Sequence, residues 1–134
     1  MSERVTVESL KAFVDPRGIV FEPLLADAFT DQKNAHVVIT EPGQVRGNHR
    51  HPRGREVCVV MGPALVRVKE SADLDPLDFV VEVGAIERFV FPPGVSHAIQ
   101  NTGSAPQVLV SFNTVTHDSS NPDVEREVLI LPPS

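Results

Sequence analysis

Short apolar runs, interrupted by proline and glycine, constrain the fold of this chain most strongly. The 134 residues include 12 prolines and 8 glycines, and turn residues recur roughly every 8–12 positions between runs of valine, isoleucine and phenylalanine. Segment 64–69 alternates in part, as expected for a sheet with one buried face. No stretch keeps a helical period over about 11 residues. The pattern predicts an all-β protein.

The expected strands are short, and one helical turn is expected at 24–29. The strand ranges are 11–14, 19–22, 36–40, 45–51, 56–61, 64–69, 77–83, 88–91, 97–101, 108–113 and 127–131. We expect a double-sheet jelly roll, whose mouth typically holds a small-molecule site. The length predicts a single domain over residues 1–134.

Composition and charge exclude several classes of function. The net charge of −6 and the lack of tryptophan and tyrosine argue against nucleic-acid binding. No apolar stretch approaches the ~18 residues of a membrane span, and no signal peptide is expected at the start of the chain. The single cysteine, Cys58, stands in an apolar run. It is predicted to be a buried hydrophobic residue of a protein in a reducing compartment, and we expect a cytoplasmic location.

Three histidines and a carboxylate stand in two polar segments. His49 and His51 are two positions apart in a stretch that reads as extended, so both rings point to one face of a strand. His97 follows a Pro-Gly turn, and Glu56 begins an apolar run. If they converge, these side chains suit a first-row metal site or an acid–base pocket.

These segments resemble the two motifs of the cupin superfamily, Gly43-x5-His49-x-His51-x4-Glu56 and Pro92-x-Gly94-x2-His97-x3-Asn101. The resemblance implies a cupin double-stranded β-helix, in which His49, His51, Glu56 and His97 would bind a divalent metal such as Zn, Fe, Ni or Mn. Glu56 and Gly62 are one residue closer together than is usual in the family. If Gly62 anchors the alignment, Arg55 takes the carboxylate position, so both alternatives remain open.

Three shorter motifs resemble nucleotide-sugar 3,5-epimerases and 3,4-ketoisomerases, and above all the C-terminal cupin domain of bifunctional capsular polysaccharide enzymes. They are Phe13-Val-Asp15-Pro-Arg17-Gly18, Arg46-Gly47-Asn48-His49-Arg50-His51 and Asn121-Pro122-Asp123. The resemblance implies proton abstraction next to the ketone of a 4-keto-6-deoxyhexose carried by dTDP or UDP. His49 would be the base, Arg17 and Arg46 would bind substrate, and two chains would pair as a homodimer.

The chain also departs from this pattern. Rhamnose-pathway epimerases use a tyrosine as the opposing acid, and this chain has none. Segment 64–69 lacks the aspartate that orients their histidine. A metal-dependent cupin enzyme of another class, such as a dioxygenase or a small-molecule isomerase, therefore remains an alternative, as does a non-catalytic sugar- or effector-binding cupin. His36 and His117 are predicted to lie at the surface or behind the site.

Overall fold

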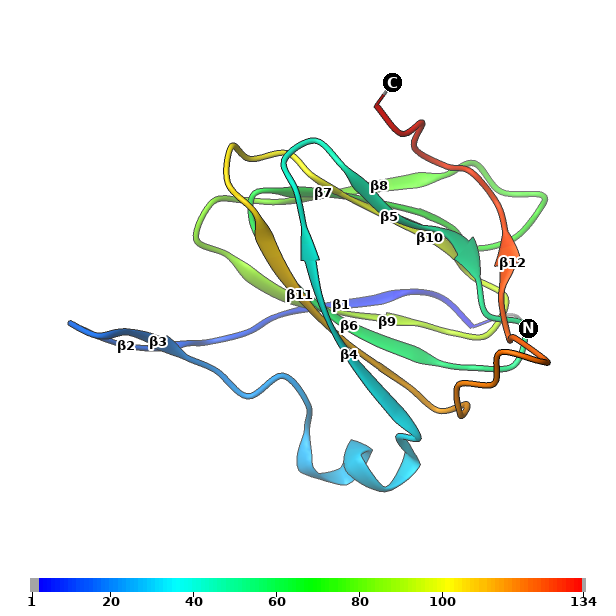
Figure 1. Ribbon diagram of the computed structural model, residues 1–134, viewed down its shortest axis with the longest axis horizontal. Coiled ribbons are helices and arrows are strands. Elements are labelled where there is room, and N and C mark those ends of the chain that lie inside the picture. The colour runs from blue at the N-terminus through cyan, green and yellow to red at the C-terminus, as the bar shows by residue number, and fades with distance from the viewer. Residues whose placement is uncertain (1–2, 134) are drawn as a thin grey trace.

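Two five-stranded antiparallel sheets face each other and form a barrel (Figure 1). The computed structural model describes residues 3–133, so the ends of the predicted domain 1–134 lie outside it. The strands are β1 (Thr6–Ser9), β2 (Phe13–Asp15), β3 (Gly18–Val20), β4 (Asn34–Thr40), β5 (Val45–Arg50), β6 (Glu56–Met61), β7 (Ala64–Lys69), β8 (Leu77–Val81), β9 (Ile86–Phe91), β10 (Ser96–Asn101), β11 (Gln107–Asn113) and β12 (Glu125–Arg126).

The strand order crosses over between consecutive segments, as in a jelly roll. One sheet has the order β1-β9-β6-β11-β4 and the other has the order β12-β5-β10-β7-β8. A short 3₁₀ helix, η1 (Ala26–Asp31), precedes β4. The prediction of an all-β jelly roll is confirmed. None of the helices in residues 3–133 is long and apolar enough to cross a membrane.

The core fills the space between the sheets with small branched side chains. Along β7, the alternate residues Ala64, Val66 and Val68 are buried, which confirms the alternation expected from the sequence. Phe89 and Phe91 stack inside the barrel with ring centroids 5.8 Å apart. Cys58 is fully buried in the same cluster, as predicted. Ile99 and Leu109 of this cluster also line the cavity described below, so the core borders the site.

Strand bounds agree best with prediction where a segment is central in its sheet. Strands β6 and β7 have the predicted bounds. Strand β1 was not predicted, and the strand expected at 127–131 is wrong. Within residues 3–133, the strand next to this segment is β12, whose two residues Glu125 and Arg126 pair with β5 and precede residue 127. Residues beyond β12 instead pack as an irregular segment, in which Ile130 is buried. The predicted helical turn at 24–29 lies two residues later, as η1.

Strands β2 and β3 form a separate hairpin that projects away from the barrel (Figure 1). Phe13 pairs with Val20 and Val14 pairs with Ile19, so both faces of the hairpin carry apolar side chains. Phe13, Val14 and Val20 are each more than 60% exposed. A two-stranded hairpin is marginally stable in water without a packed face.

Candidate active site

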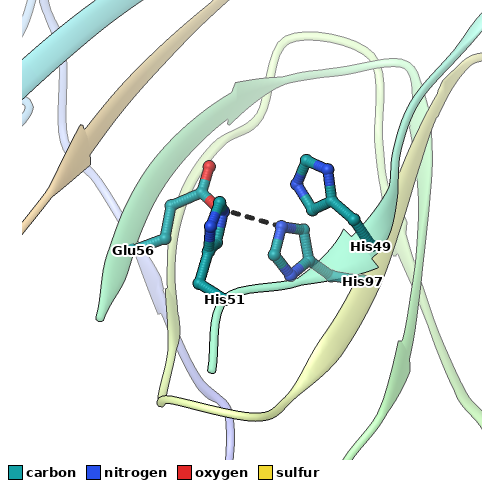
Figure 2. Close-up of side chains that lie close together, drawn as sticks. All are labelled: His49, His51, Glu56 and His97. Atoms are coloured by element: carbon teal, nitrogen blue, oxygen red, sulfur yellow. Dashed lines mark hydrogen bonds and ion pairs between the residues drawn. The ribbon is translucent and has the colours of Figure 1, made fainter. Parts of the chain in front are cut away.

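A cavity of about 300 Å³ opens between the two sheets and receives the predicted site residues. One wall is formed by β5 and β10, which supply His49 and His97. The facing wall is formed by β4, β6 and β11. The volume is at the lower end of the range for small-molecule sites. Figure 2 shows the three imidazoles and Glu56 turned toward one another.

A β-bulge in β5 sets the position of His49. His97 pairs with His49 across the strands while Ala98 pairs with Gly47, so Asn48 is the extra residue. Gly47 (φ 86°) and Asn48 (φ 55°) are both left-handed, a conformation that glycine and asparagine tolerate best. A Cβ on Gly47 would lie 2.7 Å from the backbone oxygen of His97. Gly47 and Asn48 therefore allow the left-handed backbone of the bulge and the close approach of β5 to β10.

Asn48 also holds the irregular C-terminal segment against the barrel. Its side-chain oxygen accepts hydrogen bonds from the backbone N–H groups of Leu129 (2.8 Å) and Ile130 (3.1 Å), and its amide donates to the carbonyl of Ile130 (2.9 Å). Asn48 is buried. Asn48 thus holds part of the segment expected to be a strand, together with Arg67, whose Nη1 donates to the carbonyl of Leu129 at 3.1 Å.

His51 is held from both sides of its ring. Its Nδ1 lies 2.8 Å from the backbone oxygen of Asp123, and its Nε2 lies 2.9 Å from Oε2 of Glu56. Both partners accept hydrogen bonds, so both ring nitrogens can donate when His51 is protonated. Burial alone lowers the pKa of His51, but the hydrogen bond and charge of Glu56 outweigh burial and raise it above its ordinary value.

Glu56 lies at the centre of the cluster. Besides His51, it accepts a hydrogen bond of 2.6 Å from the hydroxyl of Ser111 to Oε1. Burial alone would raise its pKa, but the neighbouring His97 and His51 hold the pKa of this carboxyl well below its usual range. Arg55, the alternative for this position, instead pairs with Glu3 at 2.5 Å. The structure therefore places Glu56, and not Arg55, among the histidines.

His97 packs flat on Phe91, with ring centroids 4.0 Å apart and ring planes 3° apart. Its Nδ1 lies 3.2 Å from the carbonyl oxygen of Val95, a contact in which Nδ1–H donates. Its Nε2 lies 2.9 Å from Oε2 of Glu56 (Figure 2), yet this buried nitrogen makes no aligned hydrogen bond within residues 3–133. A lone pair on Nε2 would face a carboxylate oxygen, which is unfavourable without a cation between the two atoms.

The donor set fits a divalent first-row metal. One ligand atom from each of His49, His51, Glu56 and His97 can be chosen so that all four lie within 4.8 Å of one another. Ligands about 2.1 Å from a common ion are at most about 4.2 Å apart, so the side chains would close by a few tenths of an ångström around it. The unpartnered Nε2 of His97 beside the Glu56 carboxylate supplies the arrangement that such an ion would complete. Imidazole and carboxylate together suit zinc and its neighbours.

His49 differs from its neighbours in charge preference. Its ring lies 4.8 Å from that of His51 and 4.9 Å from that of His97, measured between centroids. Burial, and then the nearby His97 and His51, lower its pKa from 6.5 to about 4. His49 is therefore a neutral imidazole at pH 7, which can accept a proton or bind a metal.

The two arginines predicted to bind substrate occupy different places. Arg46 lines the cavity and donates from Nη2 to the carbonyl of Ile39 at 3.0 Å. Arg17 lies at the turn of the β2–β3 hairpin, outside the cavity of its own chain, where it pairs with Asp15 at 2.6 Å. Its side chain is 90% exposed. A role for Arg17 in binding substrate remains a prediction, since this side chain does not line the cavity of its own chain.

Sequence reasoning gave no site role to several residues that the structure places at the cavity. Asp123 orients His51 through its backbone oxygen. Ser111 donates to Glu56. His36 and His117 are exposed, as predicted, but both line the cavity. For His36, the alternation of Asn34, His36 and Val38 along one strand face was the available signal.

Comparison with known proteins relates the chain to enzymes of glycan assembly. The family model described as polysaccharide biosynthesis C-terminal domain matches residues 13–125. The probable low-salt glycan biosynthesis epimerase Agl13 of Haloferax volcanii is 27% identical over 132 residues, which cover 91% of this chain and 85% of Agl13.

Solved structures show the same fold. The capsular polysaccharide assembling protein CapF from Staphylococcus aureus superposes with a TM-score of 0.67 and 26% identity over 90% of this chain. The match spans 34% of CapF, about one third of its length. A dTDP sugar isomerase from Desulfovibrio desulfuricans G20 gives a TM-score of 0.77 at 17% identity, covering 93% of this chain and 84% of the isomerase. The cupin fold implied by the two histidine motifs is confirmed.

Proposed function

The chain belongs to the polysaccharide biosynthesis C-terminal domain family, and we propose that it is a nucleotide-sugar epimerase or ketoisomerase. Its substrate would be a 4-keto-6-deoxyhexose linked to dTDP or UDP. The observation that carries the proposal is His49, a neutral imidazole on the wall of a cavity large enough for a sugar. The names of Agl13 and of the sugar isomerase with the same fold support this class of reaction.

The chemistry needs a base next to a carbonyl. Protons on the carbon beside a ketone are acidic, and a neutral imidazole removes one to give an enolate. Reprotonation of the same carbon from the other face inverts the centre, whereas reprotonation of a different atom moves the carbonyl. Arg46, on the cavity wall, is placed to hold the sugar or the diphosphate through its guanidinium.

A bound divalent ion would be held by His49, His51, Glu56 and His97. It would supply positive charge to the developing enolate oxygen. A nitrogen of His49 that coordinates the ion cannot also accept a proton, so the metal content decides whether His49 acts as the base. Elemental analysis of the purified protein measures that content directly.

The same four-residue cluster favours a second candidate, a metal-dependent cupin enzyme of another class. Stoichiometric redox-active iron, with no binding of a 4-keto nucleotide sugar, would favour that candidate. Zinc or no metal, together with binding of such a sugar, is the result expected for an epimerase or ketoisomerase.

The test of the proposed function is incubation with a dTDP- or UDP-linked 4-keto-6-deoxyhexose in D₂O. Deuterium should enter the sugar next to the ketone, and His49→Asn should slow this exchange by about 10²–10⁴-fold, the usual contribution of a general base. Failure of every such sugar to bind would contradict the proposal. A ketoisomerase that transfers the proton internally would form product that carries no deuterium. Mass and NMR analysis would detect this product and so distinguish internal transfer from inactivity.

We also propose that the protein is a single-domain homodimer in the cytoplasm. The barrel formed by residues 3–133 supports one domain. The lone buried Cys58 is compatible with a reducing compartment. The uncovered hairpin β2–β3 supports pairing of two copies, since a second copy would cover its apolar faces. Pairing would also be needed to bring Arg17 to a cavity, that of the other copy.

A further inference from the structure

A histidine outside the four-residue cluster, His36, faces the cavity from the sheet opposite His49. His36 lies on β4, whose alternate residues Asn34, His36 and Val38 line the cavity. The residues between them point outward, and Val37 and Ile39 are 72% and 59% exposed. His36 pairs across the strands with Ser111, the residue that donates to Glu56. His36 thus lies on the inner face of its sheet, two strands from Glu56 of the cluster, with β11 between them.

His36 and His49 lie on opposite sides of the space in which a sugar would bind. His49 belongs to the sheet β12-β5-β10-β7-β8 and His36 to the sheet that ends in β4. The cavity of about 300 Å³ between these sheets has room for one sugar ring. A ring bound there presents one face to each sheet. The two imidazoles therefore lie on opposite walls of the cavity.

We propose that His36 is the second proton-transfer group of this site, which delivers a proton to the face of the sugar opposite His49. The inference rests on the proposed function and assigns the reaction to epimerisation. It also supplies an acid in a chain that contains no tyrosine.

The steps balance in protons and charge. His49 takes the proton from the carbon beside the ketone, and the C–H electron pair forms the C=C bond of an enolate. Protonated His36 then gives a proton to the other face of the same carbon, and the C=O bond re-forms. One proton has left the sugar and one has entered it. His49 returns its proton to water and His36 takes one up.

His117 is the competing candidate at this end of the cavity. Its ring lies edge-on to His36, with centroids 6.4 Å apart and an interplanar angle of 80°. It belongs to the irregular segment after β11, next to Asp118, whereas His36 is fixed in a paired strand. Proton transfer to a defined face requires a fixed donor, which favours His36. His117→Asn is the matched control, because both histidines are exposed and line the same cavity.

The experiment follows deuterium and stereochemistry separately, with a dTDP-linked 4-keto-6-deoxyhexose and its epimer in D₂O. In His36→Asn and His36→Gln, the substrate should still exchange its proton through His49, within a few-fold of the normal rate, but inversion should slow by about 10²-fold or more. In His49→Asn the pattern should reverse, with exchange persisting only in the epimer. His117→Asn should keep exchange and inversion coupled.

The outcomes distinguish this inference from the proposed function. Inversion that survives in both His36 variants, or that is lost in His117→Asn and kept in His36→Asn, overturns the role of His36 alone. Equal loss of exchange and inversion in the His36 variants, with unchanged thermal unfolding, also overturns it, because His36 would then act before the proton is removed. Wild-type protein without exchange or turnover on any 4-keto nucleotide sugar overturns the proposed function itself.

Discussion

At the scale of single residues, the histidines of one cluster have opposite charge preferences. Burial and two neighbouring imidazoles lower the pKa of His49 to about 4. The hydrogen bond and the charge of Glu56 outweigh burial at His51 and raise its pKa. These differences come from contacts within 6 Å, since the three ring centroids are 4.8, 4.9 and 5.8 Å apart. The two residues therefore affect stability in different pH windows.

For metal-free protein, we expect His49→Asn to flatten the dependence of unfolding free energy on pH between about 6.5 and 4. In that window the unfolded chain binds a proton at His49 and the native chain does not, so stability falls with falling pH. His51 contributes the opposite way: its stabilisation is present below its unfolded pKa and is lost as pH rises through its raised native pKa. Urea denaturation of both His→Asn variants, with a chelator present, measures the slopes. Equal slopes for His49→Asn and wild type below pH 6.5 would contradict the assignment.

A second residue-scale prediction concerns the bulge. Gly47→Ala should destabilise the protein by more than Gly43→Ala, with the excess on the order of 1–3 kcal/mol. Both glycines have left-handed φ values of 86° and 79°, so the backbone strain is matched. Only at Gly47 does the new Cβ meet the His97 backbone oxygen, at 2.7 Å, whereas nothing lies within 4 Å at Gly43. Equal unfolding free energies for the two variants would show that the close approach of β5 and β10 is unimportant.

At the scale of elements, the sequence predicted those strands whose bounds are set by the local pattern of apolar and turn residues. Strands β6 and β7 have the predicted bounds because their apolar runs are bounded by turn residues. Strand β1 and the pair Glu125–Arg126 were missed because they are short, exposed edge strands that depend on partners distant in sequence, β9 and β5. His49, His51, Glu56 and His97 were predictable from motif spacing. The part of the facing wall formed by β4 and β11 was not, because alternation along β4 shows only that Asn34, His36 and Val38 share a face, whereas the register of β4 against β11 places that face at the cavity.

The loop between β5 and β6 is held by a segment about 70 residues later. The Asp123 carboxylate accepts hydrogen bonds from the backbone N–H groups of Gly54 (2.7 Å) and Arg53 (3.0 Å), while its backbone oxygen faces His51. We expect Asp123→Ala to cost roughly 1–3 kcal/mol, the penalty for leaving such donors unsatisfied. It should also shift the His51 resonance in NMR titration.

The matched control is Asp118→Ala, in the same irregular segment. Asp118 is exposed and hydrogen-bonds locally to Ser120, at 2.7 Å from its hydroxyl and 3.0 Å from its backbone nitrogen. This variant should leave both the unfolding free energy and the His51 titration unchanged. If Asp118→Ala and Asp123→Ala behave alike, the segment acts on the site through its general packing and not through the Asp123 carboxylate.

At the scale of the whole molecule, the barrel covers its core but leaves the hairpin β2–β3 uncovered (Figure 1). Its two faces carry the cross-strand pairs Phe13–Val20 and Val14–Ile19. A polar group on either face would cost nothing if the hairpin stood in water. The apolar side chains therefore favour burial against another surface, and a second copy of this chain is the partner that we propose.

We expect the protein to sediment as two chains at micromolar concentration, and Phe13→Asp combined with Val20→Asp to give one chain. The two substitutions place charges on the same hairpin face, where burial in an interface would leave them unpaired and cost several kcal/mol. The control is Val80→Asp, which puts a charge at a 63% exposed position on the edge strand β8. That variant should remain a dimer.

The cluster of His49, His51, Glu56 and His97 lies within each barrel, so monomeric protein should keep any metal site. Its sugar affinity should fall only if Arg17 of one copy reaches the cavity of the other, and the added variant Arg17→Ala in the dimer separates that contribution from dimerisation. A wild-type mass of one chain would contradict the prediction.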